Sequence, residues 1–167
     1  MQIIEYDKKY EEDCKDLLVE LEEYLVSIDQ DELDQVGAEY REKMLGVDFK
    51  ELEENQGKCF IAVEDNKAIG LIMGCLRSYE EADHLDYKCP KSGAITELVV
   101  TSKIRSKGVG KELMIKMEEY LKSLGCEYIF IDLFAYNKNA EIFYTKGGYH
   151  ARMHALIKKV GEDNWEN

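Results

Sequence analysis

The chain has 167 residues, of which 45% are hydrophobic and one is proline, and its formal net charge is −13. This length suits one domain with a sizeable core, and we expect residues 1–167 to form it. The negative charge argues against general nucleic-acid binding, which depends on positive side chains that neutralise phosphates. It is compatible with cationic substrates drawn by a negative field, or with an acidic surface that only serves solubility.

No apolar run approaches the roughly 20 residues that a membrane-spanning helix needs. The first residues turn acidic at once and do not form a secretory signal, so we expect a cytoplasmic protein that does not contact a membrane. The five cysteines are scattered and form no Cys-x-x-Cys pair. We therefore expect neither a disulfide framework nor a metal site.

The first third of the chain predicts one strand followed by two helices. Residues 2–6 indicate a short strand, and Asp7 can cap a helix that runs to about Ile28. Apolar residues recur in this helix at spacings of three and four, which is typical of one buried face. After an acidic loop, a second helix is predicted over residues 38–54, broken or bent near Gly46.

The hydrophobic pattern then changes to that of strands. Residues 59–64 and 68–77 indicate two strands, and the turn signal Asp65-Asn66 between them predicts a hairpin. The polar segment 78–92 reads as a mobile loop near a site. Its carboxylates either hold a cation or are simply solvated; they belong to Glu80, Glu81, Asp83 and Asp86.

A strand over 94–101, a helix over 108–124 and a strand over 128–134 follow. Such a unit implies two parallel strands joined by a right-handed crossover. Together with the antiparallel hairpin it predicts a mixed sheet with helices on its faces. Strand 128–134 is almost continuously apolar, as expected when both faces of a strand are covered.

The last part predicts a short helix over 137–146, which Gly147-Gly148 breaks. Residues 149–160 read as a final strand or hairpin.

The segment Arg105-Ser106-Lys107-Gly108-Val109-Gly110-Lys111 lies between a predicted strand and a predicted helix. A helix N-terminus has unpaired backbone N–H groups and partial positive charge, and glycines let an anion approach the backbone closely. Basic side chains are concentrated here, which favours a phosphate site over an ordinary solvated turn. They are Lys103, Arg105, Lys107 and Lys111.

Two familiar phosphate motifs do not fit this turn. The Walker A pattern requires a glycine where Arg105 stands and a serine or threonine where Glu112 stands. The dinucleotide fingerprint requires a third glycine where Leu113 stands. A nucleotide-binding protein of either class is therefore disfavoured.

The turn instead matches Arg/Gln-x-x-Gly-x-Gly/Ala, and in this it resembles the GNAT superfamily of N-acetyltransferases. The strand Ile95–Val100 looks like that family's central strand. The run from Asn137 to Tyr144, followed by Gly147-Gly148-Tyr149, is similar to its Asn-x-x-Ala-x-x-aromatic/Leu-Tyr…Gly-Tyr/Phe signature. The order of elements over nearly the whole chain fits as well, although residues before Lys58 match only in type of element.

The resemblance implies an α/β (α+β) fold of the GNAT acyl-CoA N-acyltransferase type. Its central, twisted sheet is mixed and mostly antiparallel, with six to seven strands flanked by about four helices. It also implies an enzyme that transfers the acetyl group of acetyl-CoA, without a metal, to a primary amine of an unidentified small molecule or peptide. The alternative is a non-catalytic acyl-CoA-binding sensor or interaction module. A homodimer is compatible with the sequence.

Two residues are candidates for catalysis. Glu97 interrupts an otherwise apolar strand, and the resemblance implies that it acts as the base, often through water; the alternative is an orienting or exposed carboxylate. By the same resemblance Tyr144 lies beside the cofactor sulfur and protonates the leaving thiolate, since a phenol has a pKa of about 10. The alternative is a core aromatic beside Phe143.

The resemblance also implies the cofactor contacts. Asn137 would hydrogen-bond the cofactor, or would only cap a helix, and the backbone of the central strand would pair with the pantetheine arm. The expected cofactor-binding residues are Leu98, Val99, Val100, Arg105, Ser106, Lys107, Gly108, Val109, Gly110, Lys111, Asn137, Ala140 and Tyr144. The acceptor pocket is expected to draw on the first two helices and the loop 79–87.

Overall fold

The computed structural model describes residues 1–104 and 108–161. Three expected cofactor residues, Arg105, Ser106 and Lys107, lie outside these described residues. From residue 137 onward the chain forms a separate unit, and it is described by itself. Within the described ranges, no helix combines the length and the apolar character needed to cross a membrane.

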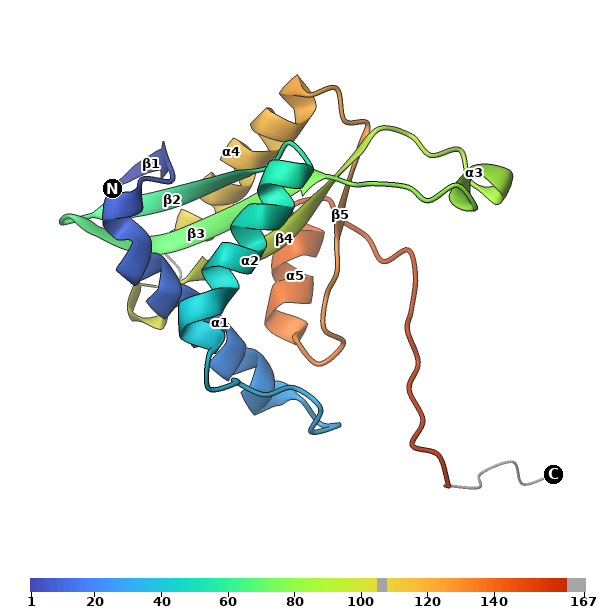
Figure 1. Ribbon diagram of the computed structural model, residues 1–167, viewed down its shortest axis with the longest axis horizontal. Helices are drawn as coiled ribbons and strands as arrows, with labels where there is room; N and C mark the ends of the chain where they lie inside the picture. Colours follow the sequence, from blue (N-terminus) through green and yellow to red (C-terminus); the bar gives the residue numbers. More distant parts are fainter. Residues whose placement is uncertain (105–107, 162–167) are drawn as a thin grey trace. The chain divides into compact units, whose positions relative to one another are not determined.

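The first unit is built on a sheet of five strands in sequence order (Figure 1). Strands β1 to β4 pair antiparallel, and β5 pairs parallel to β4. The predicted mixed, mostly antiparallel sheet is thus confirmed, with five strands in the described residues instead of six or seven. The strands are β1 (Gln2–Glu5), β2 (Lys58–Glu64), β3 (Lys67–Leu76), β4 (Ser92–Val100) and β5 (Tyr128–Ile131).

The predicted hairpin is confirmed between β2 and β3. Asp65 and Asn66 have φ values of 50° and 59°, in the left-handed region that a tight two-residue turn requires. The helices follow the expected order. They are η1 (Lys8–Tyr10), α1 (Glu11–Ile28), α2 (Tyr40–Glu54), α3 (Asp83–Asp86), η2 (Ser102–Ile104), α4 (Val109–Ser123) and α5 (Lys138–Lys146).

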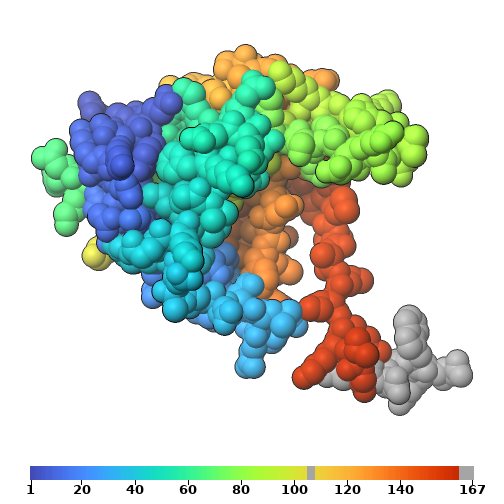
Figure 2. Space-filling model, viewed as in Figure 1, coloured from blue at the N-terminus to red at the C-terminus, as the bar shows by residue number. Residues whose placement is uncertain are grey.

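Helices α1 and α2 cover one face of the sheet (Figure 1). Leu17 and Leu18 of α1 and Leu45 of α2 pack with Leu71 and Met73 of β3 in one buried cluster. In the space-filling view, α2 (teal) lies over the strands on this face (Figure 2). Burial of these apolar side chains is the main force that holds the two helices on the sheet.

Helix α4 covers the opposite face at close range, because the strands present glycines beneath it. A Cβ atom built on Gly70 would come within 3.2 Å of Leu113, and one on Gly93 would come within 2.7 Å of Leu121. A Cβ atom built on Gly74 would likewise lie 2.8 Å from the sulfur of Met117. The absence of side chains at three positions therefore lets the helix settle against the sheet.

Three expectations about elements were wrong. Helix α2 runs through Gly46 without a break, because the glycine is exposed while Leu45 and Leu52 anchor the helix in the core. Strand β5 stops at Ile131, where its pairing with β4 also stops, and Tyr128 is 59% exposed instead of covered. Residues 149–159 form no strand in the structure, since an apolar sequence needs a neighbouring strand to pair its backbone.

Candidate active site

Strand β4 contains a β-bulge immediately before Glu97. Met73 of β3 pairs with Glu97 but the next residue, Gly74, pairs with Ile95, so Thr96 is the extra residue. Pairing between β4 and β5 covers only Ser92–Ile95, whereas β4 continues to Val100. The two parallel strands therefore part at the bulge, which is the place where bulges commonly redirect a functional side chain.

Glu97 lies on the face of the sheet that α1 and α2 cover, because its antiparallel partner Met73 belongs to the core cluster there. Desolvation by burial, and then the negative charges of Asp48, Glu22 and Glu51, raise the pKa of its carboxyl to about 8. Such a carboxyl is largely protonated at neutral pH and ionises in mildly alkaline solution. A proton acceptor works best when its pKa is close to the working pH.

Asp48 was not expected from the sequence. It lies on α2 and is only 6% exposed, and burial raises the pKa of its carboxyl to about 6, with a further contribution from Glu51. A signal was available: Asp48 follows Leu45 by three residues and precedes Leu52 by four, which places it on the buried face of the helix. Because unpaired acidic residues are rarely buried, an acidic residue on the apolar face of a helix indicates a functional role.

Two more groups from the helices belong to this region. The hydroxyl of Tyr40 at the start of α2 hydrogen-bonds the carboxylate of Glu22 on α1. Burial raises the pKa of Tyr40, and the charges of Glu22, Glu97 and Asp48 raise it further. Burial and Asp34 raise the pKa of Glu22. We call Glu22, Asp48 and Glu97 the carboxyl cluster.

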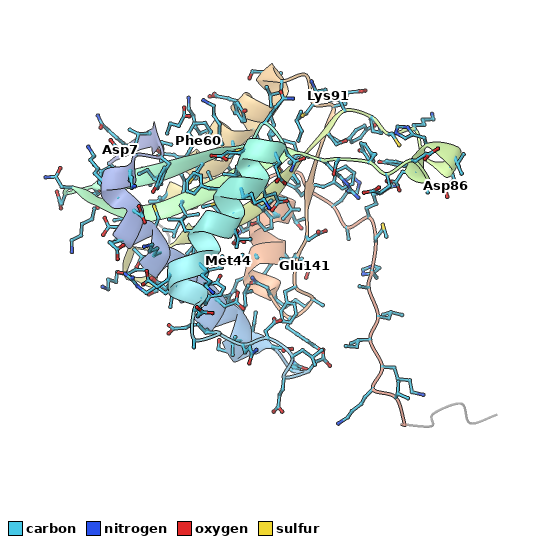
Figure 3. All side chains as sticks on the ribbon, viewed as in Figure 1. Asp7, Met44, Phe60, Asp86, Lys91 and Glu141 are labelled. Atoms are coloured by element: carbon cyan, nitrogen blue, oxygen red, sulfur yellow. The ribbon has the colours of Figure 1, made fainter. Side chains whose placement is uncertain are left out.

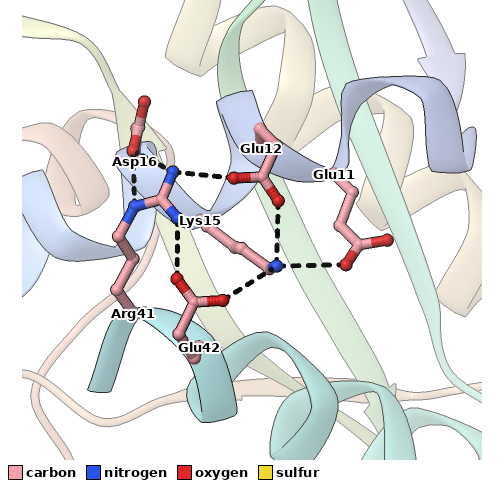
Figure 4. Close-up of polar contacts among 6 residues, drawn as sticks. All are labelled: Glu11, Glu12, Lys15, Asp16, Arg41 and Glu42. Atoms are coloured by element: carbon pink, nitrogen blue, oxygen red, sulfur yellow. Dashed lines mark hydrogen bonds and ion pairs between the residues drawn. The ribbon is translucent and has the colours of Figure 1, made fainter. Parts of the chain in front are cut away.

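The cations nearest on these helices are committed to other carboxylates (Figure 4). Lys15 Nζ lies 2.9 Å from Glu12 and 3.3 Å from Glu42, and Arg41 lies 2.8 Å from Asp16. This network ties α1 to α2. Within the part of the chain that the structure describes, no ion pair reaches the carboxyl cluster.

The structure describes the residues on both sides of the predicted phosphate turn. On the strand side, the carboxylate of Glu20 accepts a hydrogen bond from the backbone N–H of Ser102 in η2. On the helix side, Gly108 is the N-cap of α4 with φ +83°, and none of the described residues has an atom within 4 Å of the position a Cβ would occupy. Val109 is buried and Lys111 is exposed. The backbone at Gly108 is therefore open to approach from outside.

The family assignment comes from comparison with known proteins. A model of the Acetyltransferase (GNAT) family matches residues 18–149. The chain belongs to this family. The resemblance predicted from the turn and from the Asn137–Tyr144 motif is thereby confirmed, and so is the fold class.

Similar sequences and solved structures agree with this assignment. A glucosamine 6-phosphate N-acetyltransferase of Arabidopsis thaliana is 37% identical over 60 residues, which are 36% of this chain and 38% of that protein. The match thus spans less than half the length of that relative. The tetramutant of the BH1408 protein from Bacillus halodurans superposes with a TM-score of 0.80 at 15% identity, covering 96% of this chain and 100% of the other.

A solved aminoglycoside N-acetyltransferase, AAC(6')-Iy in complex with CoA, gives a TM-score of 0.67 at 17% identity. It covers 95% of this chain and 98% of its own. At these identities the solved structures show that this chain has the GNAT fold.

The second GNAT motif lies in the unit that begins at residue 137. The side-chain oxygen of Asn137 accepts a hydrogen bond of 3.2 Å from the backbone N–H of Ala140, so the interpretation of Asn137 as a helix cap is confirmed. Tyr144 is half-buried, and its ring centroid lies 5.2 Å from Phe143 and 5.9 Å from Tyr149. These rings set the direction of the phenol within α5.

The acidic loop expected to shape the acceptor pocket lies apart from the carboxyl cluster. Asp83 is used locally, where it accepts a hydrogen bond of 2.8 Å from the backbone N–H of Glu80. Asp86 is exposed, in a loop that extends well to the side of α2, where Met44 is labelled (Figure 3). These carboxylates are solvated, whereas those of Asp48 and Glu97 are shielded from water.

Proposed function

We propose that this protein transfers the acetyl group of acetyl-CoA to a primary amine of a small molecule or peptide. The observation that carries the proposal is Glu97, a shielded carboxyl at the bulge of β4 whose pKa is raised to about 8. Two similar proteins support a primary amine as the acceptor. One match is a glucosamine 6-phosphate N-acetyltransferase, and one structural neighbour is an aminoglycoside N-acetyltransferase bound to CoA.

In this proposal residues of the first unit hold the acyl donor. The backbone of Leu98, Val99 and Val100, beyond the end of the β4–β5 pairing, pairs with the pantetheine arm. The diphosphate lies against the amides from residue 105 to Lys111, where the glycine at 108 leaves the backbone accessible. Asn137 and Ala140 complete the contacts from the second motif.

The chemistry requires two proton transfers. An alkylammonium has a pKa of about 10, so it must lose a proton before its nitrogen can attack. Glu97 accepts this proton directly or through water. A C–N bond then forms at the acetyl carbonyl carbon, the C–S bond breaks, and the Tyr144 hydroxyl protonates the leaving thiolate. The second nitrogen proton restores the phenol, and overall one ammonium and one thioester give one amide, one thiol and one proton.

We further infer that residues 1–167 act as one domain, and that the protein is cytoplasmic, as its sequence predicts. A second candidate function is an acyl-CoA-binding sensor without turnover. It is disfavoured by Glu97, because a sensor has no use for a carboxyl held at the cost of desolvation.

Two measurements test the proposed function. Acetyl-CoA should raise the melting temperature, as a ligand of the native state must, while ATP and NAD should not. Release of free thiol from acetyl-CoA should then be followed across a panel of amines. Turnover should rise with pH up to about 8 in the wild type, and Glu97→Gln should flatten that rise. If acetyl-CoA raised the melting temperature but no amine caused release of free thiol, the acyl-CoA-binding sensor would be the better-supported function.

A further inference from the structure

Asp48 has a buried carboxylate oxygen for which the protein provides no hydrogen bond. The residue is 6% exposed, and its Oδ2 atom has no hydrogen-bond partner among the described residues. Leaving a buried carboxylate oxygen unsatisfied is costly, and native proteins do so rarely unless a ligand completes the contact. In the proposed acetyl transfer Asp48 acts on Glu97 only through its charge and contacts neither the donor nor the acetylated amine.

The surroundings of Asp48 lack positive charge. The charges of Glu22 on α1 and Asp48 on α2 both act on Glu97 of β4. Lys15 and Arg41 pair with Glu12, Asp16 and Glu42 instead, and on α2 Lys43 pairs with Glu39 and Lys50 with Glu54. In the described parts of the chain no three histidine, cysteine or acidic side chains are grouped so as to hold a metal ion. The partner that the cluster lacks is therefore a cation that donates hydrogen bonds, and an ammonium group has both properties.

A largely apolar hollow lies along the first half of α2. An open hollow of about 370 Å³ is lined by Tyr40, Met44 and Val47, together with residues 37–39 and Lys43. Tyr40 lines this hollow and also contacts the carboxyl cluster, through its hydrogen bond to Glu22. Apolar side chains beside shielded carboxylates suit a molecule that has methylene groups as well as ammonium groups.

We propose that Asp48 binds a second ammonium group of the acceptor, so that the protein acts on aliphatic diamines and polyamines in preference to monoamines. This deepens the proposed function and rests on it for the acetylated end of the acceptor. One amino group lies at Glu97, the methylenes lie along Tyr40 and Met44, and the other amino group stays charged against Asp48.

The test compares butane-1,4-diamine with butylamine, which differ by one terminal amino group. Kinetics are measured at about pH 9, above the pKa of Glu97, so that this carboxyl is ionised in every variant. The wild type should favour the diamine in kcat/KM by about 10- to 100-fold, the range expected of a hydrogen-bonded charge pair. Asp48→Asn should remove this preference through KM and leave butylamine unchanged.

Matched controls separate a binding role from a structural one. Glu53→Gln removes an exposed acid of α2 whose charge is not among those that raise the pKa of Asp48 or Glu97, and it should leave the kcat/KM of both amines unchanged. The melting temperature of each variant checks the fold, and equal losses for both amines in Asp48→Asn would show that Asp48 only supports the structure.

Measuring the affinity for the diamine in the absence of acetyl-CoA tests the ammonium site separately from the proposed acetyl transfer. Titration calorimetry should show that the diamine binds the wild type at least tenfold more tightly than Asp48→Asn does, whether or not turnover is found. If butylamine and the diamine are acetylated equally well, the ammonium site is refuted while acetyl transfer stands. If the diamine binds but no amine is acetylated, acetyl transfer is refuted and the site stands. Displacement of the diamine by millimolar Mg²⁺ would mark the cluster as a metal site and refute the inference.

Discussion

Replacing Glu97 with glutamine should stabilise the fold in alkaline solution. In the wild type the folded state keeps this carboxyl protonated up to a pKa of about 8, while the unfolded chain loses the proton near the ordinary value of 4.5. Between these two values folding must take up a proton, so the stability of the wild type falls as pH rises. Below the lower value the proton is bound in both states and there is no cost.

The size of this effect follows from the two pKa values. A rise from 4.5 to about 8, at about 1.4 kcal/mol for each pKa unit, corresponds to a cost of up to about 5 kcal/mol above pH 8. Glutamine has nearly the same shape and does not ionise. Glu97→Gln should therefore resemble the wild type at about pH 5 and exceed its free energy of unfolding by several kcal/mol at about pH 9.

Urea denaturation at several pH values, followed by circular dichroism, measures both free energies of unfolding. Asp86→Asn is a suitable control, because this exposed carboxylate is not among the charges that raise the pKa of Glu97, and its removal should leave the pH dependence caused by Glu97 in place. A Glu97→Gln variant that is no more stable than the wild type at the alkaline end would refute the claim that Glu97 is held in a shielded, acid-rich place.

Other substitutions test the remaining parts of the reasoning. Gly108→Trp should abolish acetyl-CoA binding in calorimetry yet fold, at a cost of about 1–2 kcal/mol for φ +83°; retained binding would place the diphosphate elsewhere. Tyr144→Phe should lower turnover about 10²-fold or more with little change in acetyl-CoA affinity, and unchanged turnover would remove it from the acid role. Gly70→Ala should destabilise by about 1–3 kcal/mol in urea titrations, because its Cβ would lie 2.9 Å from the carbonyl oxygen of Val99. Gly46→Ala, where nothing lies within 4 Å, should instead stabilise by about 0.5–1 kcal/mol, and a loss would contradict the continuous helix.

Local patterns predicted much of the fold. The end of α1 at Ile28, the turn at Asp65-Asn66 and the cap at Asn137 all follow from spacing and from the conformations that these residues favour. These features depend on contacts within a few residues, which a sequence displays directly. The GNAT turn was recognised for the same reason.

What depends on pairing between distant residues was predicted less well. The length of β5 and the absence of a strand over 149–159 depend on which backbone edge is available, and hydropathy does not carry that information. The bulge at Thr96 likewise appears only in the register between β3 and β4.

The candidate site was predicted in part. Glu97 is visible in the sequence because it interrupts an apolar strand. Its high pKa is not visible, since it comes first from burial and then from the charges of Asp48 and Glu22, which lie 49 and 75 positions earlier in the chain. The acids of the loop 79–87 attracted attention by their density, yet exposure leaves their charges solvated. Burial, which gives a carboxylate its chemical character, is decided by tertiary packing.

The close approach of α4 to the sheet has a mechanical consequence. A helix of 15 residues is a stiff rod about 22 Å long, and here it is seated on three bare stretches of backbone at Gly70, Gly74 and Gly93. A methyl group added at Gly93 would lie 2.7 Å from the side chain of Leu121 and would push the end of the helix away from the sheet. In the proposed function the amides at Gly108 bind the coenzyme, so mutations along the whole length of α4 would weaken that binding.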